Sequence, residues 1–314
     1  MKNLKYYQFI CNIFPPILSQ RIRNIIFPIS VARQSNLSFS KKSITGSIFQ
    51  GNISDYHSYR FAIHGFFEWR NIIIAKRYIE KYKGDIVEIG ANVGTETISY
   101  CDLIANTAKV HAFEPLPENF KSLKELTQRL NNLVVYPNAI SNKTAVVNFQ
   151  LPPKHESGTG KIIENDSNQL IEDSLLVNAL PLDAFMNEFK DVCLISIDTE
   201  GHEPFVLDGA QIVINKFRPA VIIEVSPKLL RKYAHSSSKN IQQYFIDLNY
   251  RCYIIKRSTL VQVNELNLNL KKAENWFCIP SEKAGILKKI KRDLLMRAVI
   301  PWYLLKSITT STNN

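Results

Sequence analysis

Ionisable residues crowd together at one point of the sequence, directly after an apolar segment with the composition of a buried strand. The segment 191–198 ends in Asp198, and Glu200, His202 and Glu203 follow within five positions. An imidazole with an ordinary pKa of about 6.5 suits a general base at neutral pH. Asp198, at the strand end, could orient an acceptor hydroxyl, take its proton or hold a cationic group. We therefore take Asp198, His202 and Glu200 as the candidate catalytic residues.

Each of these residues also has a structural alternative. His202 could cap the helix expected to begin near Glu203, and Glu200 and Glu203 could interact with the positive end of that helix. Asp198, Glu200 and Glu203 also offer the oxygen ligands that Mg²⁺ prefers. Spacing alone does not establish a coordination geometry, so no metal site is assigned. Glu224, at the end of a later strand, could belong to the site or only to the strand.

A second group of residues surrounds a glycine-containing turn, Glu88-Ile-Gly90-Ala-Asn92-Val-Gly94, at the end of an expected strand. Gly90 and Gly94 remove side chains where the chain turns sharply, so that its backbone can approach a ligand. Glu88 is placed to hold an ammonium group, directly or through water. Glu114, 24 positions after Gly90 at the end of the next strand, fits a carboxylate that accepts hydrogen bonds from ribose hydroxyls.

The glycine spacing decides which nucleoside ligand these residues would hold. The spacing is G-x-x-x-G, and not the G-x-G-x-x-G with which a helix N-terminus binds a pyrophosphate. S-adenosylmethionine (SAM) has an ammonium group and no phosphate, so it matches both features. The pattern therefore predicts SAM as the cofactor. The alternatives are an NAD(P)-binding oxidoreductase or epimerase, and a non-catalytic scaffold that keeps the SAM fold at a membrane surface.

Strand and helix patterns alternate along the chain and predict where these side chains lie. Helices are expected over 66–82 and 118–130. The expected strands are 85–90, 108–115, 132–141, 145–150, 191–198, 219–226, 250–256 and 275–280. Such alternation predicts an α/β fold with a mostly parallel sheet, helices on both faces and ligands at the carboxyl ends of the strands. The polar stretch 152–175 predicts an inserted loop or hairpin that shapes the acceptor pocket.

The ordered motifs resemble those of the FkbM-type SAM-dependent methyltransferases. The matching stretches are VEIGANVGTETI (87–98), HAFEPLPENFKSLKE (111–125), VVYPNAIS (134–141), LPLDAF (180–185), ISIDTEGHEPFVLDGA (195–210) and IIEV (222–225). The resemblance implies a Rossmann-like class I SAM methyltransferase with a mostly parallel seven-stranded sheet. It also implies methyl transfer to a hydroxyl of a carbohydrate-like or natural-product acceptor.

The same resemblance implies a set of cofactor-binding residues. Around SAM it places Glu88, Gly90, Asn92, Gly94 and Glu114, with Asn138 and Ala139 against the adenine. The family's first acidic residue is typically Asp, whereas this chain has Glu88. The side chain is longer by one methylene group, so its contact with the ammonium could be direct or water-mediated.

Charge divides the chain into three expected parts: a basic N-terminal extension, 1–65, the methyltransferase domain, 66–280, and a basic amphipathic C-terminal tail, 281–314. Residues 1–51 contain seven basic and no acidic residues, and 52–280 is close to neutral within a net charge of +11. A nucleic-acid modifier usually spreads positive charge over its substrate face, so we expect a glycan or small-molecule acceptor and no nucleic acid. Residues 1–55, with three prolines and a serine-rich stretch, are expected to be irregular.

The C-terminal tail has alternating apolar and basic faces over 283–306, with Ile290 and Leu294 on one side and Lys288 and Lys291 on the other. This pattern predicts peripheral contact with an anionic membrane, and a helix docked on the domain is the alternative. The sequence has no apolar run of the roughly 18–20 residues that cross a bilayer, and its five cysteines are scattered singly. We therefore expect a cytoplasmic enzyme, peripheral on the inner membrane face if the tail binds lipid.

Overall fold

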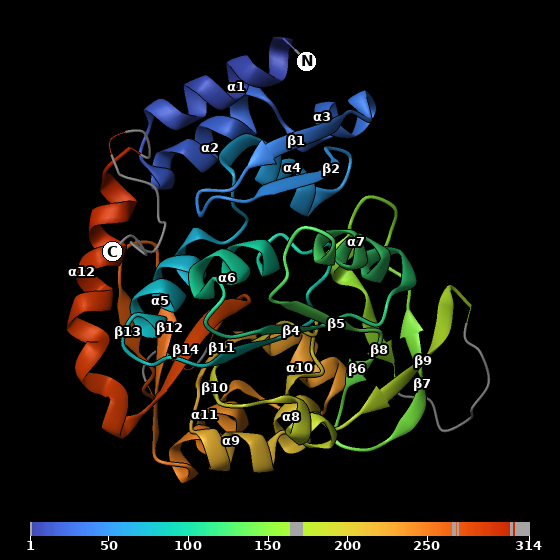
Figure 1. Ribbon diagram of the computed structural model, residues 1–314, viewed down its shortest axis with the longest axis vertical. Helices are drawn as coiled ribbons and strands as arrows, with labels where there is room; N and C mark the ends of the chain where they lie inside the picture. The colour runs from blue at the N-terminus through green and yellow to red at the C-terminus, as the bar shows by residue number, and fades with distance from the viewer. Residues whose placement is uncertain (1, 164–171, 266–267, 269, 302–303, 305–314) are drawn as a thin grey trace.

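An eight-stranded sheet runs through the computed structural model, which describes residues 2–163, 172–265, 268, 270–301 and 304 (Figure 1). The strand order is β13-β12-β14-β11-β10-β3-β4-β5. The strands are β3 (Asp85–Ile89), β4 (Val110–Phe113), β5 (Leu133–Tyr136), β10 (Val192–Ile197), β11 (Ala220–Val225), β12 (Tyr250–Ile255), β13 (Leu260–Gln262) and β14 (Glu274–Pro280). The α/β class is confirmed, with an eighth strand because the short β13 folds back on β12 at the edge.

The central strands are parallel, so their carboxyl ends share one edge of the sheet. Strands β11, β10, β3, β4 and β5 pair in parallel, whereas β14 is antiparallel to both β11 and β12. In register, Glu88 lies beside Ala112 of β4 and Ser196 of β10. The residues that follow these strands are therefore brought together although they are far apart in the sequence.

Both faces of the sheet are apolar, because successive strand residues point to opposite sides. Ile86 and Leu194 join one buried cluster, and Val87 and Ile195 join the other. One face is covered by α5 (Trp69–Ile79), α6 (Thr97–Ile104), α7 (Pro117–Thr127) and α12 (Leu287–Val299). The opposite face is covered by α8 (Glu203–Asp208), α9 (Gln211–Phe217), α10 (Pro227–Tyr233) and α11 (Ser238–Asp247).

The expectation that residues 1–55 are irregular is wrong. They form α1 (Lys2–Ile13), α2 (Pro16–Ile26), α3 (Ile29–Ser35), β1 (Ser38–Lys42) and β2 (Ile48–Asn52), followed by α4 (Tyr56–His64). Pro16 is the first residue of α2 and Pro28 precedes α3, where the missing amide hydrogen costs no helical bond. Cys11 and Phe27 are buried in the same apolar cluster as Ile86, so this segment shares its core with the sheet.

The inserted stretch forms part of a second, four-stranded sheet beside the carboxyl edge. Its order is β6-β9-β7-β8, with β6 (Ala139–Ile140), β7 (Ala145–Gln150), β8 (Lys161–Ile163) and β9 (Ser174–Leu180). The turn η1 (Ser157–Thr159) precedes β8. Residues 164–171 of the stretch lie outside the described residues.

The apolar stripe expected in the C-terminal tail packs on the domain. In α12, which follows the short η3 (Ser281–Ile286), Ile290, Leu294 and Ala298 are fully buried. They belong to the same cluster as α5, and Arg77 of α5 forms an ion pair with Asp293 at 2.5 Å. The docked-helix alternative therefore describes α12. In the part of the chain that the structure describes, no helix combines the length and apolarity needed to cross a bilayer.

Asp102 of α6 joins the N-terminal hairpin to the sheet domain. Its carboxylate accepts hydrogen bonds from Thr45 Oγ1 at 2.7 Å and from the Ser47 amide at 2.9 Å and Oγ at 2.5 Å. Since hydrogen bonds to a charged group contribute about 1.5–3 kcal/mol each and are not additive, we expect Asp102→Ala to lower the free energy of unfolding by about 2–4 kcal/mol. Urea denaturation measures this change.

The matched control is Asp191→Ala, which removes an exposed carboxylate just before β10. We expect it to change the free energy of unfolding by less than about 0.5 kcal/mol. Equal effects of the two substitutions would show that Asp102 does not hold the hairpin.

Candidate active site

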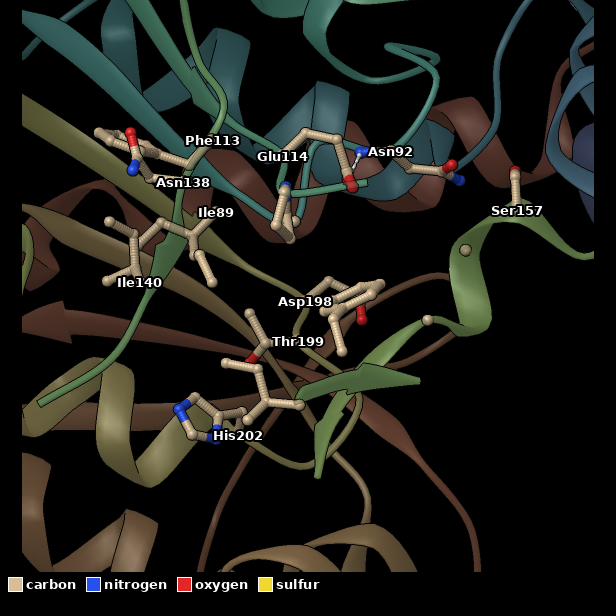
Figure 2. Close-up of a pocket in the computed structure, with 17 residues that line it drawn as sticks. Ile89, Asn92, Phe113, Glu114, Asn138, Ile140, Ser157, Asp198, Thr199 and His202 are labelled. Carbon is tan, nitrogen blue, oxygen red and sulfur yellow. Dashed lines mark hydrogen bonds between the residues drawn. The ribbon is translucent and has the colours of Figure 1, made fainter. Parts of the chain in front are cut away.

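The carboxyl ends of β3, β4 and β10 line a cleft made of two adjoining hollows. The Glu114 hollow encloses about 510 Å³ and is lined by Glu114, Asn138, Ala139, Ile140 and His202, among other residues (Figure 2). The Glu88 hollow encloses about 430 Å³ and is lined by Glu88, Glu96 and Ser196, among others. Ile89, Gly90, Asn92, Gly158 and Asp198 line both hollows. The structure therefore places Glu88 and Glu114 in adjoining parts of one cleft.

Glu114 connects the ends of the first two strands. One of its carboxylate oxygens accepts the Asn92 amide at 2.8 Å and the other accepts the Leu116 amide at 2.9 Å. Each oxygen keeps a second lone pair, and the carboxylate lines the hollow, so it can also accept hydrogen bonds from ligand hydroxyls. Burial outweighs these bonds and raises the pKa of Glu114 to about 7.

The turn after β3 approaches neighbouring backbone closely at Gly90. Gly90 has φ +82°, and a Cβ there would lie 1.9 Å from the carbonyl oxygen of Asp198. Asn92 is also left-handed, with φ 51°, and its side-chain amide is buried with no partner among the described residues. Both residues line the two hollows.

Gly94 differs from the other residues of the turn. It is absent from the lining of both hollows, and a Cβ at Gly94 would lie 2.5 Å from Leu126 and 3.0 Å from Leu123. With φ +89°, this glycine lets α7 pack on the turn. Its place in the structure is that of a packing residue behind the cleft.

The Glu88 hollow is acidic. Burial, together with the charge of Glu114, raises the pKa of Glu88 to about 8, and Glu88 Oε2 has no partner among the described residues. Burial and the charge of Glu88 raise the pKa of Glu96 well above its usual value. A cation in this hollow would stabilise the charged forms of both carboxylates and so lower their pKa values. Glu96 was not among the sequence-predicted residues, although it lies six positions after Gly90, directly before α6.

Asp198 forms a carboxyl cluster with Glu200, a second catalytic candidate, and with Glu224. One oxygen each of Asp198, Glu200 and Glu224 lie within 4.8 Å of one another. Enclosure in the cleft, followed by the charges of Glu224 and Glu200, raises the pKa of Asp198 well above its usual value. Burial also raises the pKa of Glu200 to about 7 and that of Glu224 to about 8. Such a cluster can hold a proton at neutral pH, and its oxygens are also suited to a divalent cation.

Glu203 supports the loop and does not join the carboxyl cluster. Its Oε1 accepts hydrogen bonds from the amides of Thr199 and Gly201 and from Thr199 Oγ1, each at 3.1 Å. This fully buried carboxylate holds Glu200 in a left-handed conformation, with φ 54°. Glu224 therefore takes the place that the sequence expectation gave to Glu203 among the candidate cation ligands.

His202 lies in the Glu114 hollow, below Thr199 and away from the Glu114 carboxylate in Figure 2. It is 5% exposed, and its Nε2 is 2.9 Å from Ser141 Oγ. Burial lowers the pKa of His202 to about 4, so the ring is neutral at pH 7. The contact with Ser141 connects His202, the residue before α8, to the segment after β6.

Residues of the insert and of the N-terminal segment also line the cleft. Gly158 of η1 lines both hollows, and Ser157 is held by its amide donating to Asp55 Oδ1 at 3.1 Å. His57 of α4 lines the Glu88 hollow with Phe67, their ring centroids 4.1 Å apart. Neither aromatic residue carries a motif, so the sequence alone offered no sign of them. The insert lines the Glu114 hollow and, through Gly158, the Glu88 hollow, and its role in shaping the acceptor pocket stays a prediction.

Comparison with known proteins shows several methyltransferases that are similar to this chain. The chain is 26% identical over 141 residues to the hexuronic acid methyltransferase AglP of Haloferax volcanii, over 44% of this chain. It spans about half of the length, 54%, of that curated relative. Among solved structures, an FkbM methyltransferase from Methylobacillus flagellatus aligns with a TM-score of 0.41 and 15% identity, over 83% of this chain and 60% of that chain. A SAM-dependent methyltransferase from Agrobacterium tumefaciens aligns with a TM-score of 0.41 and 7% identity, over 78% and 70%.

The family comparison identifies a methyltransferase FkbM domain over residues 88–252. This range begins at Glu88 and contains Glu114, Asp198 and Glu224, and it makes up just over half of the 314 residues. The chain therefore belongs to the FkbM family of SAM-dependent methyltransferases.

Proposed function

We propose that this enzyme binds SAM across the two hollows and transfers its methyl group to an oxygen of a carbohydrate-like acceptor. The observation that carries the proposal is the division of the cleft into two parts. The Glu88 hollow is acidic and has an unpartnered carboxylate oxygen, which suits the ammonium and sulfonium charges of SAM. The Glu114 hollow has a carboxylate for ribose hydroxyls, and Asn138 and Ala139 for the adenine.

Methyl transfer to an oxygen requires a residue that positions the acceptor and takes its proton. Bound SAM supplies an electrophilic methyl group on a sulfonium. The acceptor oxygen must lie about 3 Å from that carbon, in line with the breaking bond to sulfur. Asp198 lines both hollows and belongs to the carboxyl cluster, so we assign the removal of the acceptor proton to Asp198, with Glu200 and Glu224 sharing the charge. His202 then serves as a positioning residue for the loop, through Ser141.

The carbohydrate acceptor is proposed from the relative, which methylates a hexuronic acid. A labelled-methyl screen with purified protein, comparing neutral and uronic-acid glycosides, tests this class. We expect transfer to an oxygen of a glycoside. SAM binding without transfer to any glycoside, combined with transfer to a lipid or polyketide hydroxyl, would contradict it.

Glu114→Gln is expected to weaken SAM binding by about 10- to 100-fold, because a neutral amide cannot accept both backbone amides and the ribose hydroxyls with equal strength. Calorimetric titration measures the Kd. The control is Glu118→Gln, in the first turn of α7, which removes an exposed charge and is expected to leave the Kd within about twofold. Equal Kd values for the two variants would remove Glu114 from the SAM site.

SAM binding is expected to release protons at pH 6.5. Glu88, with a pKa of about 8, is protonated at this pH, whereas the ammonium of SAM, with a pKa of about 8, already carries its proton. A cation beside Glu88 favours the carboxylate, so a proton leaves on binding, and affinity rises with pH between about 6 and 8. Calorimetry in two buffers of different ionisation enthalpy measures the release, which Glu88→Gln should diminish. Proton uptake by the wild type, or an unchanged release in Glu88→Gln, would contradict this assignment.

Asp198→Asn is expected to lower kcat by about 100-fold or more, because proton removal in the transition state contributes about 10²–10⁴. His202→Gln should lower kcat by less than about tenfold. The labelled-methyl assay is run with EDTA and with added Mg²⁺. Activity that survives EDTA fits proton transfer, and loss on chelation with recovery in Mg²⁺ would assign the carboxyl cluster to a cation. A larger loss for His202→Gln than for Asp198→Asn would make His202, and not Asp198, the base.

A further inference from the structure

A third hollow, larger than either hollow of the cleft, lies between the N-terminal segment and the other half of the sheet. It has an empty volume of about 1420 Å³, part of it open to solvent, and is bordered by α2, α4, the start of α5 and the turn between β12 and β13. We call it the basic chamber. The basic residues that line it are Arg21, Arg23, Arg60, Arg70, Lys256, Arg257 and Lys272. All the residues that line the chamber lie outside the family-matched range 88–252, so it is built from the flanking segments of the chain.

The chamber has far more positive than negative charge. Glu274 is the one acidic residue among its lining residues, and it forms an ion pair with Lys256 at 3.0 Å. Glu68, behind the wall, is shared by Arg60 at 3.0 Å and Arg70 at 2.8 Å. Of the four remaining cations, Arg21, Arg257 and Lys272 are exposed, and none of these three forms an ion pair within the described part of the chain.

Arg23 shows that the chamber lacks a counter-charge. Its side chain is only 4% exposed, and no described carboxylate lies within ion-pair distance. The guanidinium hydrogen-bonds the neutral Asn24 side chain and lies over the Tyr59 ring, and its Nη1 has no partner among the described residues. Burial and the charge of Arg60 lower the pKa of Arg23. A buried, unpaired guanidinium is costly, and a bound anion would offset that cost.

The chamber and the cleft share a wall. Tyr56, Arg60 and Trp69 line the chamber. From the same two segments of the chain, His57 and Phe67 line the Glu88 hollow. The Arg60 guanidinium lies over the Phe67 ring, 4.4 Å from its centroid. A group held in the chamber is therefore separated from the cleft by the thickness of side chains.

The strand order places the chamber beyond the carboxyl cluster, on the side away from Glu114. Along the carboxyl edge, Glu114 follows β4, Asp198 follows β10 and Glu224 lies near the end of β11. The next strands are β14, where Glu274 is paired with Val225, and β12, which ends before Lys256. The cleft, which includes Asp198, occupies one half of the edge and the basic chamber the other, and Glu224 lies between Asp198 and the chamber in the strand order.

We propose that the basic chamber binds the phosphate or diphosphate group of the acceptor, while the acceptor oxygen reaches Asp198. Arginine forks suit the oxygens of phosphate, and several converging cations suit a group with two or more charges. The assignment of this anion to the acceptor rests on the proposed function, whereas anion binding by the chamber does not. Two sources share this chemistry: a soluble sugar phosphate or diphosphate, and a phosphate-containing lipid.

A pair of charge-matched double variants tests the chamber. Arg257→Ser with Lys272→Ser removes two exposed cations from the chamber. Arg251→Ser, on β12, with Lys271→Ser, next to Lys272, removes two exposed cations outside the lining residues. Full-length protein is titrated calorimetrically with inorganic pyrophosphate at low ionic strength, where screening is weak. Glucuronate is the comparison anion, SAM is titrated separately into each protein, and vesicles with and without phosphatidylglycerol form the lipid arm.

We expect wild type and the control pair to bind pyrophosphate with similar Kd, and the chamber pair to bind it at least about tenfold more weakly. SAM affinity should be equal in all three proteins. If the wild type binds pyrophosphate but does not bind SAM, the proposed function is contradicted, whereas anion binding by the chamber is supported. Vesicle binding weakened only in the chamber pair would identify a lipid phosphate as the source, and unchanged vesicle binding a soluble one. Equal pyrophosphate Kd values for both pairs, no pyrophosphate binding by wild type, or tighter binding of glucuronate would overturn the inference.

Discussion

Buried carboxylates that accept backbone amides hold the two turns on which the cleft depends. Glu114 accepts the Asn92 and Leu116 amides, and Glu203 accepts those of Thr199 and Gly201. Each carboxylate, through these hydrogen bonds, supports a left-handed non-glycine residue, Asn92 or Glu200. The backbone at that residue is strained without such support. The two turns also touch, since Gly90 passes directly against the Asp198 carbonyl. The positions of the cofactor residues and of the catalytic carboxylate are therefore mutually dependent.

Strand order converts this local geometry into a division of chemistry along one edge. The central parallel strands bring Glu114, Glu88 and Asp198 to neighbouring positions, and the antiparallel β14 extends the edge toward the basic chamber. Carboxyl groups with raised pKa values surround the part of the cleft assigned to a cationic cofactor. Arginines and lysines surround the basic chamber, which is assigned to the anionic group of the acceptor. The two regions are close, so opposite charges on the two substrates would help to hold them in one orientation.

The sequence predicted the elements that its local patterns determine. Alternating apolar strands and the turn from Glu88 to Gly94 located β3, β4, β10 and β11, and hence the cleft. The sequence-based predictions failed where tertiary contacts determine the structure. The prolines of residues 1–55 suggested irregularity, but Pro16 and Pro28 stand at helix starts. Glu203 lies six positions after the end of β10 and Glu224 lies within β11, and only the fold shows that Glu203 turns toward loop amides whereas Glu224 joins the carboxyl cluster.

Residues supplied from distant segments were beyond sequence reasoning for a physical reason. His57 and Phe67 reach the cleft because α4 packs on the sheet domain, and their own neighbours in sequence carry no pattern that indicates a ligand. Gly94 shows the converse case, since its spacing matched a ligand turn and its free space is filled by Leu123 and Leu126. A glycine allows close approach without specifying which partner approaches.

A crystal structure of the protein with S-adenosylhomocysteine would show directly whether the two hollows hold the cofactor. We expect the ligand's amino group within hydrogen-bond distance of Glu88 or Glu96, its ribose hydroxyls on Glu114, and its adenine beside Asn138 and Ala139. The sulfur should then face Asp198. A ligand bound in the reverse direction, or outside the two hollows, would contradict this arrangement.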